Sequence, residues 1–195
     1  MPLHVPISLL QFWTFSGCGL VFFLFLLRAL SQRKPESGSK RDPRSRAGIA
    51  IQSIGIAFTG FGPVRPTLAP LAPLSLAATA TILVLMGGAI GLFAASSREL
   101  GRNWSLVART RSDHELVRSG PYSRVRHPIY LAMLLFLLGL AVALGHYVQL
   151  AAAIPLFLVG TKIRRDAEDR LLRTQFGEAH GLYAREVPAL IPKIV

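Results

Sequence analysis

Two groups of polar side chains in this sequence could bind a ligand, and each lies beside an apolar segment. The first group is the triplet Arg126, His127 and Pro128, with Tyr122 before it and Tyr130 after it. Proline suits the first turn of a helix, because its missing N–H would have no partner there. The free N–H groups of a helix beginning at Pro128, together with the two adjacent cations, favour an anionic ligand group.

The second group is a run of charged residues with helical spacing. Arg164 and Glu168 are four residues apart and therefore share one face of a helix, and Asp169 lies on the neighbouring face. Gly177 is expected to end this helix. Carboxylates bind an ammonium group or ribose hydroxyls, and cations bind a carboxylate. A ligand that carries all of these, such as S-adenosylmethionine, suits the two groups together.

Each group also has a purely structural interpretation. Arginine and histidine beside a membrane segment commonly act as interfacial anchors. A charge run on a helix is commonly a solvated face with ion pairs. Either group alone favours the structural interpretation, and only their combination favours a binding site.

The composition is typical of an integral membrane protein. Hydrophobic residues make up 51% of the 195 residues and charged residues only 16%. A membrane-spanning helix needs about 20 apolar residues. Five apolar segments approach that length, and the second and fifth are short enough to be tilted or re-entrant: about 7–30, 47–64, 70–96, 128–146 and 148–163. We therefore expect an all-α integral membrane protein with about five transmembrane helices.

Basic residues indicate the topology. The net charge is +12, and all but one of the 22 lysines and arginines fall in segments 28–46, 97–127 and 162–195. Five spans would put these segments on one side, and positive loops stay cytoplasmic. The N-terminus would then lie outside, and the C-terminus and active site would be cytoplasmic. Aromatic residues do not interleave with the basic clusters, so nucleic acid is not an expected partner.

The pattern divides the chain into two parts. Residues 1–97 would hold three helices and a basic linker, 31–46, that contacts anionic lipid headgroups. Residues 98–195 would hold a long loop, two transmembrane helices and a C-terminal amphipathic helix. A loop of this length is usually functional, and its "SLVART" and "SDHELVRSG" stretches suggest a short strand pair or turn. This loop and the C-terminal helix would form a cytoplasmic cofactor pocket.

The motifs "LGRNWS", "HELV", "GPYSRVRHPIYLAM" and "RRDAEDRLLRTQFGEAHGLYAREVPALIP" occur in this order. In that arrangement residues 98–193 resemble the isoprenylcysteine carboxyl methyltransferase family. These are integral membrane methyltransferases related to the phospholipid N-methyltransferases. The resemblance implies S-adenosylmethionine as cofactor and a lipophilic methyl acceptor that arrives from the bilayer.

The resemblance also implies residue roles. Arg164 would hold an acceptor carboxylate, and Glu168 would orient that arginine. The family usually has a second glutamate where this chain has Asp169, whose reach is one methylene shorter. The cofactor-binding positions carried over from the motifs are His114, Leu116, Val117, Gly120, Tyr122, His127, Pro128, Tyr130, Glu168 and Asp169.

Other functions remain open from the sequence. The acceptor could be a phospholipid amine or a small thiol. A membrane reductase of the sterol type, using NADPH, has a similar C-terminal half, and a scaffold without any ligand is a third alternative. The single cysteine, Cys18, and the absence of any grouped metal ligands in the sequence predict no metal site. No glycine-rich dinucleotide fingerprint occurs. His180 and Tyr183 are interpreted as surface or packing residues.

Overall fold

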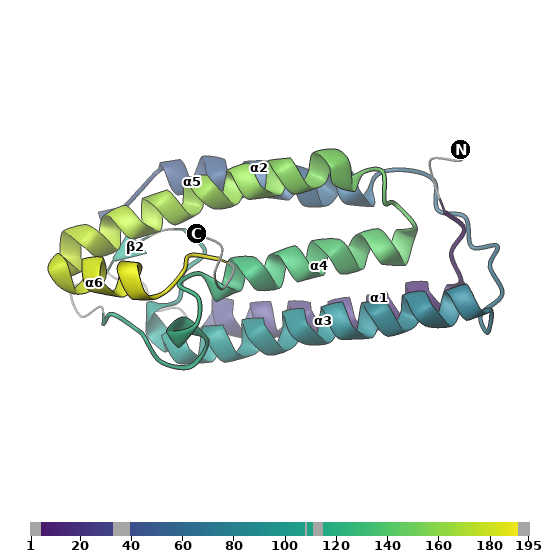
Figure 1. The fold of residues 1–195 in the computed structure, drawn as a ribbon, viewed down its shortest axis with the longest axis horizontal. Coiled ribbons are helices and arrows are strands. Elements are labelled where there is room, and N and C mark those ends of the chain that lie inside the picture. Colours follow the sequence, from purple (N-terminus) through teal and green to yellow (C-terminus); the bar gives the residue numbers. More distant parts are fainter. Residues whose placement is uncertain (1–4, 33–39, 108, 111–114, 191–195) are drawn as a thin grey trace.

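The computed structural model describes residues 5–32, 40–107, 109–110 and 115–190. In this part of the chain nearly all regular structure is helical (Figure 1). Two 3-10 turns, Gly101–Asn103 and Gly120–Ser123, and a two-residue strand pair, β1 (Lys40–Arg41) and β2 (Arg109–Thr110), complete it. The α-helices are α1 (Leu9–Ser31), α2 (Arg44–Gly60), α3 (Pro73–Leu100), α4 (Pro128–Leu144), α5 (Leu150–Phe176) and α6 (Glu178–Glu186).

The five long helices lie side by side and run alternately in opposite directions (Figure 1). Helix α5 packs along α2, and α3 packs along both α1 and α4. The connections that follow α1 and α3 meet at one end of the bundle, where α6 also lies (Figure 1). We call this the α6 end. It is the end that carries the basic segments and the predicted site.

Two of the described helices are long and apolar enough to cross a membrane, α1 with 23 residues and α3 with 28. Helix α4 is as apolar but has 17 residues. The five predicted apolar segments all form helices at the expected places, with α4 beginning at Pro128 as its proline predicts. The number of helices that actually span the bilayer stays a prediction.

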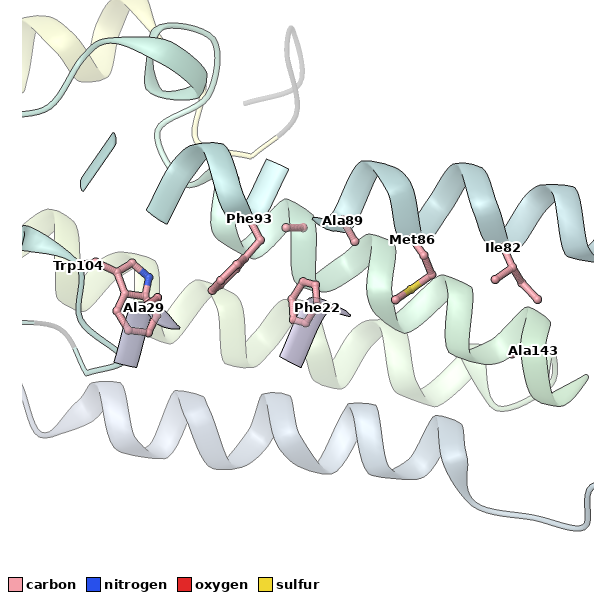
Figure 2. Close-up of a cluster of buried hydrophobic side chains, with 9 residues drawn as sticks. Phe22, Ala29, Ile82, Met86, Ala89, Phe93, Trp104 and Ala143 are labelled. Carbon is pink, nitrogen blue, oxygen red and sulfur yellow. The ribbon is translucent and has the colours of Figure 1, made fainter. Parts of the chain in front are cut away.

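Apolar side chains fill the space between α1, α3 and α4 (Figure 2). Phe22 of α1 packs against Phe93 of α3, with ring centroids 5.0 Å apart. Phe93 in turn meets the edge of Trp104, 6.2 Å away, just beyond the end of α3. Tilted and edge-on aromatic pairs of this kind add to the gain from burial. This aromatic row continues the core to the α6 end.

Helices α2 and α5 approach each other through glycines. A Cβ built on Gly160 would lie 2.7 Å from the backbone nitrogen of Gln52 and 2.7 Å from the carbonyl oxygen of Gly48. A Cβ on Gly55 would lie 3.0 Å from the Ala153 carbonyl oxygen. Small residues let membrane helices pack backbone against backbone in this way. The close approach places polar side chains of α2 directly against α5.

The end of the linker before α2 contacts the long loop. Strand β1 pairs with β2 of the long loop, so that Lys40 faces Thr110 and Arg41 faces Arg109. The described strand of the loop, β2, therefore pairs with the linker, and residues 111–114 of the loop lie outside the described chain. Asp42, two residues before the start of α2, accepts a hydrogen bond from the backbone N–H of Arg44 at 2.9 Å. The linker thus joins the N-terminal part of the chain to the predicted catalytic half.

The α2–α5 contact makes a stability prediction. We expect Gly160→Ala to lower the free energy of unfolding by about 1–3 kcal/mol, because the two nearest neighbours of the new methyl group are backbone atoms. Thermal unfolding in detergent would measure the change. Gly91→Ala in α3 is the matched control, since nothing lies within 4 Å of its Cβ. That control should be neutral or roughly 0.5–1 kcal/mol more stable. Equal effects of the two substitutions would contradict the close approach.

Candidate functional site

A cavity of about 210 Å³ opens at the α6 end. Its walls come from the start of α4, the polar half of α5, helix α6 and the loop after α3. Eight of the residues predicted from the sequence line it: Leu116, Val117, Tyr122, His127, Tyr130, Arg164, Glu168 and Asp169. The loop before α4 and the C-terminal helices therefore meet around one cavity, although they are far apart in the sequence.

Three predicted residues are not placed in the cavity wall. Gly120 has a φ of +56°, and a Cβ there would come within 3.3 Å of the Glu99 side chain, so this glycine serves the turn before α4. Pro128 is buried as the first residue of α4. His114 lies outside the described residues.

Asp169 is surrounded by basic side chains. Its Oδ1 lies 3.3 Å from Nε2 of His127 and 3.3 Å from Nε2 of His180, and its Oδ2 lies 3.8 Å from Nη2 of Arg126. Burial alone would raise the pKa of Asp169, but these neighbours, His127 above all, lower it to about 2. Asp169 is therefore an anion at every physiological pH.

His127 lies between two carboxylates. Its Nδ1 is 3.3 Å from Oε2 of Glu168, while its Nε2 faces Asp169. Burial lowers the pKa of His127, but the two carboxylates outweigh that effect and raise it above its usual value of 6.5. His127, the cation predicted beside the start of α4, thus lies against two carboxylates of α5. Glu168 also accepts a hydrogen bond from the hydroxyl of Tyr130.

Arg164 is the most enclosed cation of the cavity wall, with 4% of its surface exposed. Its Nη1 donates to Oε1 of Gln52 at 2.6 Å, and its Nη2 donates to the carbonyl oxygen of Leu106 at 2.9 Å. The guanidinium carbon lies 4.7 Å from the ring centroid of Tyr130, a cation–π contact. Arg164 is therefore linked to Glu168 through Tyr130, while its direct hydrogen bonds go to α2 and to the loop.

The residues after α5 close the end of the cavity. The hydroxyl of Tyr183 in α6 donates to the carbonyl oxygen of Tyr122 at 2.6 Å. The backbone N–H groups of Arg126 and His127 donate to the carbonyl oxygens of Pro188 and Ala189 at 2.9 and 3.0 Å. Tail and loop thereby hold the His127 ring in place.

Three residues at this site were not identified as functional from the sequence. His180 was interpreted as a surface or packing residue, but it is 1% exposed and lines the cavity beside Asp169. Tyr183 also lines the cavity. Gln52 is buried on α2 and contacts Arg164. Nothing in the sequence spacing joins His180 or Gln52 to the two polar groups.

The opposite wall is apolar. Phe22 and Leu26 of α1, Phe93 of α3, Trp104 of the loop and Met133 of α4 line it. Such a wall suits the hydrocarbon part of a ligand, whereas the wall of α5 suits its charged part. The cavity therefore has one apolar wall and one charged wall.

Nε of Arg164 is buried and has no hydrogen-bond partner in the described chain. Nε2 of His127 and Oδ1 of Asp169 are also buried, and they lie 3.3 Å apart as an ion pair without hydrogen-bond geometry. Buried polar groups left unpaired are costly, and a bound polar ligand would pair them. Carboxylate and cationic atoms in one cavity fit a ligand that carries ammonium, carboxylate and hydroxyl groups, as S-adenosylmethionine does. The described residues contain no group of three or more His, Cys, Asp or Glu side chains that could hold a metal ion.

A family comparison gives the class of protein. Residues 77–179 match the family described as phospholipid methyltransferase. This range is more than half of the chain, and it runs from α3 through the cavity-lining part of α5. The chain belongs to the phospholipid methyltransferase family.

Individual relatives match over the same half. The cobalt-zinc-cadmium resistance protein CzcN of Cupriavidus metallidurans is 37% identical over 107 residues, 54% of this chain and 49% of that protein. The nickel-cobalt-cadmium resistance protein NccN of Alcaligenes xylosoxydans xylosoxydans is 35% identical over 108 residues, with the same coverage of both chains. The protein-S-isoprenylcysteine O-methyltransferase of Schizosaccharomyces pombe is 34% identical over 99 residues, 49% of this chain and 42% of that protein.

The chain spans about half the length of the curated relatives it matches. The resemblance to membrane methyltransferases seen in the sequence motifs is confirmed by the family match and by the yeast relative.

The raised pKa of His127 predicts how stability depends on pH. Its charged form stabilises the fold below pH 6.5, and this contribution is lost as the pH rises through the raised folded-state pKa. We therefore expect the melting temperature in detergent to fall as the pH rises above 6.5. Burial lowers the pKa of His180, so that this second histidine is already neutral above pH 6.5. His127→Gln should show a smaller fall. An equal fall in both proteins would assign the effect to another group.

Proposed function

We propose that this protein transfers a methyl group from S-adenosylmethionine to the carboxylate of a lipophilic, isoprenylcysteine-like acceptor. The observation that carries this proposal is the environment of Arg164. This arginine is buried, and its hydrogen bonds go to neutral oxygens and to no carboxylate. It lies between an anionic wall and an apolar wall of one cavity. A buried positive charge of this kind favours a ligand that brings the negative charge.

The anionic wall supplies the cofactor's contacts in this proposal. Asp169 and Glu168 would accept hydrogen bonds from its ammonium group and ribose hydroxyls, and His127 would bind its carboxylate. When bound, the cofactor supplies an electrophilic methyl group on a sulfonium. The side chains need only align two partners, because methyl transfer is an in-line displacement that depends on approach and orientation.

Arg164 would hold the acceptor. A carboxylate is already a nucleophile, so that no general base is needed beside it. The guanidinium would fix the carboxylate oxygen near the cofactor while Phe22, Phe93 and Trp104 contact the apolar chain. An amine acceptor fits this wall less well, because its ammonium form would be repelled by Arg164. This charge argument favours a carboxylate over a phospholipid amine.

The proposed topology places the cavity at the cytoplasmic face. The α6 end carries the basic segments, and the alternating directions of α1 to α5 are those of five consecutive passes (Figure 1). The N-terminus would then lie outside. An acceptor anchored in the bilayer would reach the cavity sideways, with its polar end at the membrane surface.

Calorimetry on detergent-purified protein tests the cofactor. We expect S-adenosylhomocysteine to bind with micromolar affinity and NADPH not to bind. Asp169→Asn should weaken the binding at least about tenfold, since it removes one charge from a buried ligand contact. Asp166→Asn is the matched control on the same helix, because Asp166 pairs with the exposed Lys162 outside the cavity wall. Binding of NADPH instead would favour the reductase.

A transfer assay with the same preparations tests the acceptor. With a farnesylated cysteine as methyl acceptor, Arg164→Met should lower kcat/KM by at least about 100-fold and leave S-adenosylhomocysteine binding nearly unchanged. Arg165→Met, one residue along and outside the cavity wall, should keep its activity. Full activity of Arg164→Met would contradict the role of Arg164, and methylation of a phospholipid amine alone would replace the acceptor class.

Cysteine labelling tests the topology. In a Cys18→Ser background, Glu178→Cys places a thiol on exposed α6 and Val148→Cys places one on the exposed α4–α5 connection at the other end. A membrane-impermeant maleimide added to intact cells should label Val148→Cys and spare Glu178→Cys. The reverse pattern would invert the proposed orientation.

A further inference from the structure

We propose that Gln52 of α2 is a positioning residue that fixes Arg164 and, being neutral, leaves the arginine's charge for the acceptor carboxylate. The inference rests on the proposed role of Arg164 and extends it to a helix outside the matched residues 77–179. In this proposal a contact between α2 and α5 determines whether the enzyme prefers a charged or a neutral acceptor.

Gln52 is held in one orientation at both ends of its amide. It is 1% exposed, its Nε2 donates to the hydroxyl of Thr161 at 2.6 Å, and its Oε1 accepts from Nη1 of Arg164 at 2.6 Å. A guanidinium has only donors, so the amide oxygen must face it and the amide nitrogen must face Thr161. Thr161 therefore fixes the glutamine, and the glutamine fixes the arginine.

Part of the Arg164 guanidinium remains available to bind a ligand. The Gln52 and Leu106 bonds use Nη1 and Nη2, and Tyr130 covers one face. Nε has no hydrogen-bond partner in the described chain, and the side chain lines the cavity. Arginine binds carboxylates best when its planar fork is already oriented. Gln52 provides this orientation before the acceptor arrives.

The neutrality of Gln52 is as important as its geometry. A glutamate at this position could accept the same hydrogen bond from Arg164 but would cancel its charge. Glu168, one helical turn away, is instead engaged by the Tyr130 hydroxyl and lies near His127. Among the described residues, no carboxylate lies within ion-pair distance of the Arg164 guanidinium. The net positive charge of the guanidinium is thus preserved for an anionic ligand.

The glycine contacts make this arrangement possible. A Cβ on Gly48 would lie 2.6 Å from Cγ of Arg164, and a Cβ on Gly160 would lie 2.8 Å from Cγ of Gln52. At this close helix spacing the Gln52 amide contacts both Thr161 and Arg164. The α2–α5 glycines therefore belong to the positioning of the site as well as to the stability of the bundle.

The test compares two probes that differ only in charge, N-acetyl-S-farnesylcysteine and its carboxamide. Their affinities would be measured by calorimetry on the full chain saturated with S-adenosylhomocysteine. The wild type should prefer the carboxylate by at least about tenfold. Gln52→Glu should bring the ratio close to one, and Gln52→Met should lower it at least about threefold, because the first cancels the charge and the second releases the guanidinium. Both should bind S-adenosylhomocysteine like the wild type.

Two further variants separate positioning from folding. Thr161→Val removes the anchor of the glutamine amide and should lower the ratio, whereas Thr161→Ser keeps the hydroxyl and should restore it. Gln149→Met is the matched control, because this glutamine bonds the carbonyl oxygen of Phe61 at the opposite end of the bundle. A full carboxylate preference in folded Gln52→Glu would overturn the proposal. Should that variant fail to fold, an unchanged ratio in Thr161→Val would overturn it equally.

Chemical modification of Arg164 tests its positioning without depending on which acceptor the protein uses. Phenylglyoxal should modify Arg164 slowly in the wild type and at least about threefold faster in Gln52→Met, as followed by mass spectrometry of the α5 peptide. A wild type that binds S-adenosylhomocysteine but does not prefer the carboxylate probe would contradict the proposed acceptor class. Faster modification in Gln52→Met would still establish the positioning of Arg164, and an unchanged rate would overturn it.

Discussion

The burial of the polar half of α5 is the constraint on which the site depends. Helix α5 packs along α2 and helix α4 along α3, so that the cavity lies where the two pairs meet. Charged side chains of α5 can be buried there only if polar or charged groups bind them. Asp169 lies beside His127 and His180 from two other segments, whereas Arg164 has hydrogen bonds to neutral groups and no counter-charge. The cavity therefore has an anionic side at Asp169 and a cationic side at Arg164.

The long helices form two layers that are packed in different ways. The layer of α1, α3 and α4 is built from interlocking aromatic and aliphatic side chains, which tolerate a range of lipid-like contacts. The contact of α2 with α5 is built from backbone approach and buried hydrogen bonds, which tolerate little displacement. A reacting carboxylate needs precise placement, whereas a hydrocarbon chain needs only a suitable surface. Helix α5 lines the charged part of the cavity, and α1 and α3 line the apolar part.

Local signals in the sequence predicted the local structure correctly. Pro128 marked the start of α4, Gly177 marked the end of α5, and the apolar segments gave the places of five helices. The motif resemblance brought together both halves of the cavity wall, because the motif residues keep their order and spacing. The roles assigned to those residues stay predictions, although eight of them line one cavity.

Residues that depend on contacts between helices were not predictable in this way. Gln52 lies in a glycine-rich segment of modest hydropathy, and nothing in its neighbours indicates that a cation 112 positions later will contact it. His180 follows a helix end and looks solvent-exposed until α6 folds back on Asp169. The pairing of the linker with the loop is equally remote in the sequence. Such contacts follow from packing, which a local pattern does not encode.

The order in which the chain is made gives the α2–α5 contact a further consequence. Helix α2 leaves the ribosome well before α5, since the hydrogen bond between them joins residues 112 positions apart. Until the last long helix is made, the glutamine amide and the glycine surface of α2 lack their native partner. The arginine site can therefore form only after α5 is made, and a chain that stops before α5 has neither the site nor the α5 packing against α2.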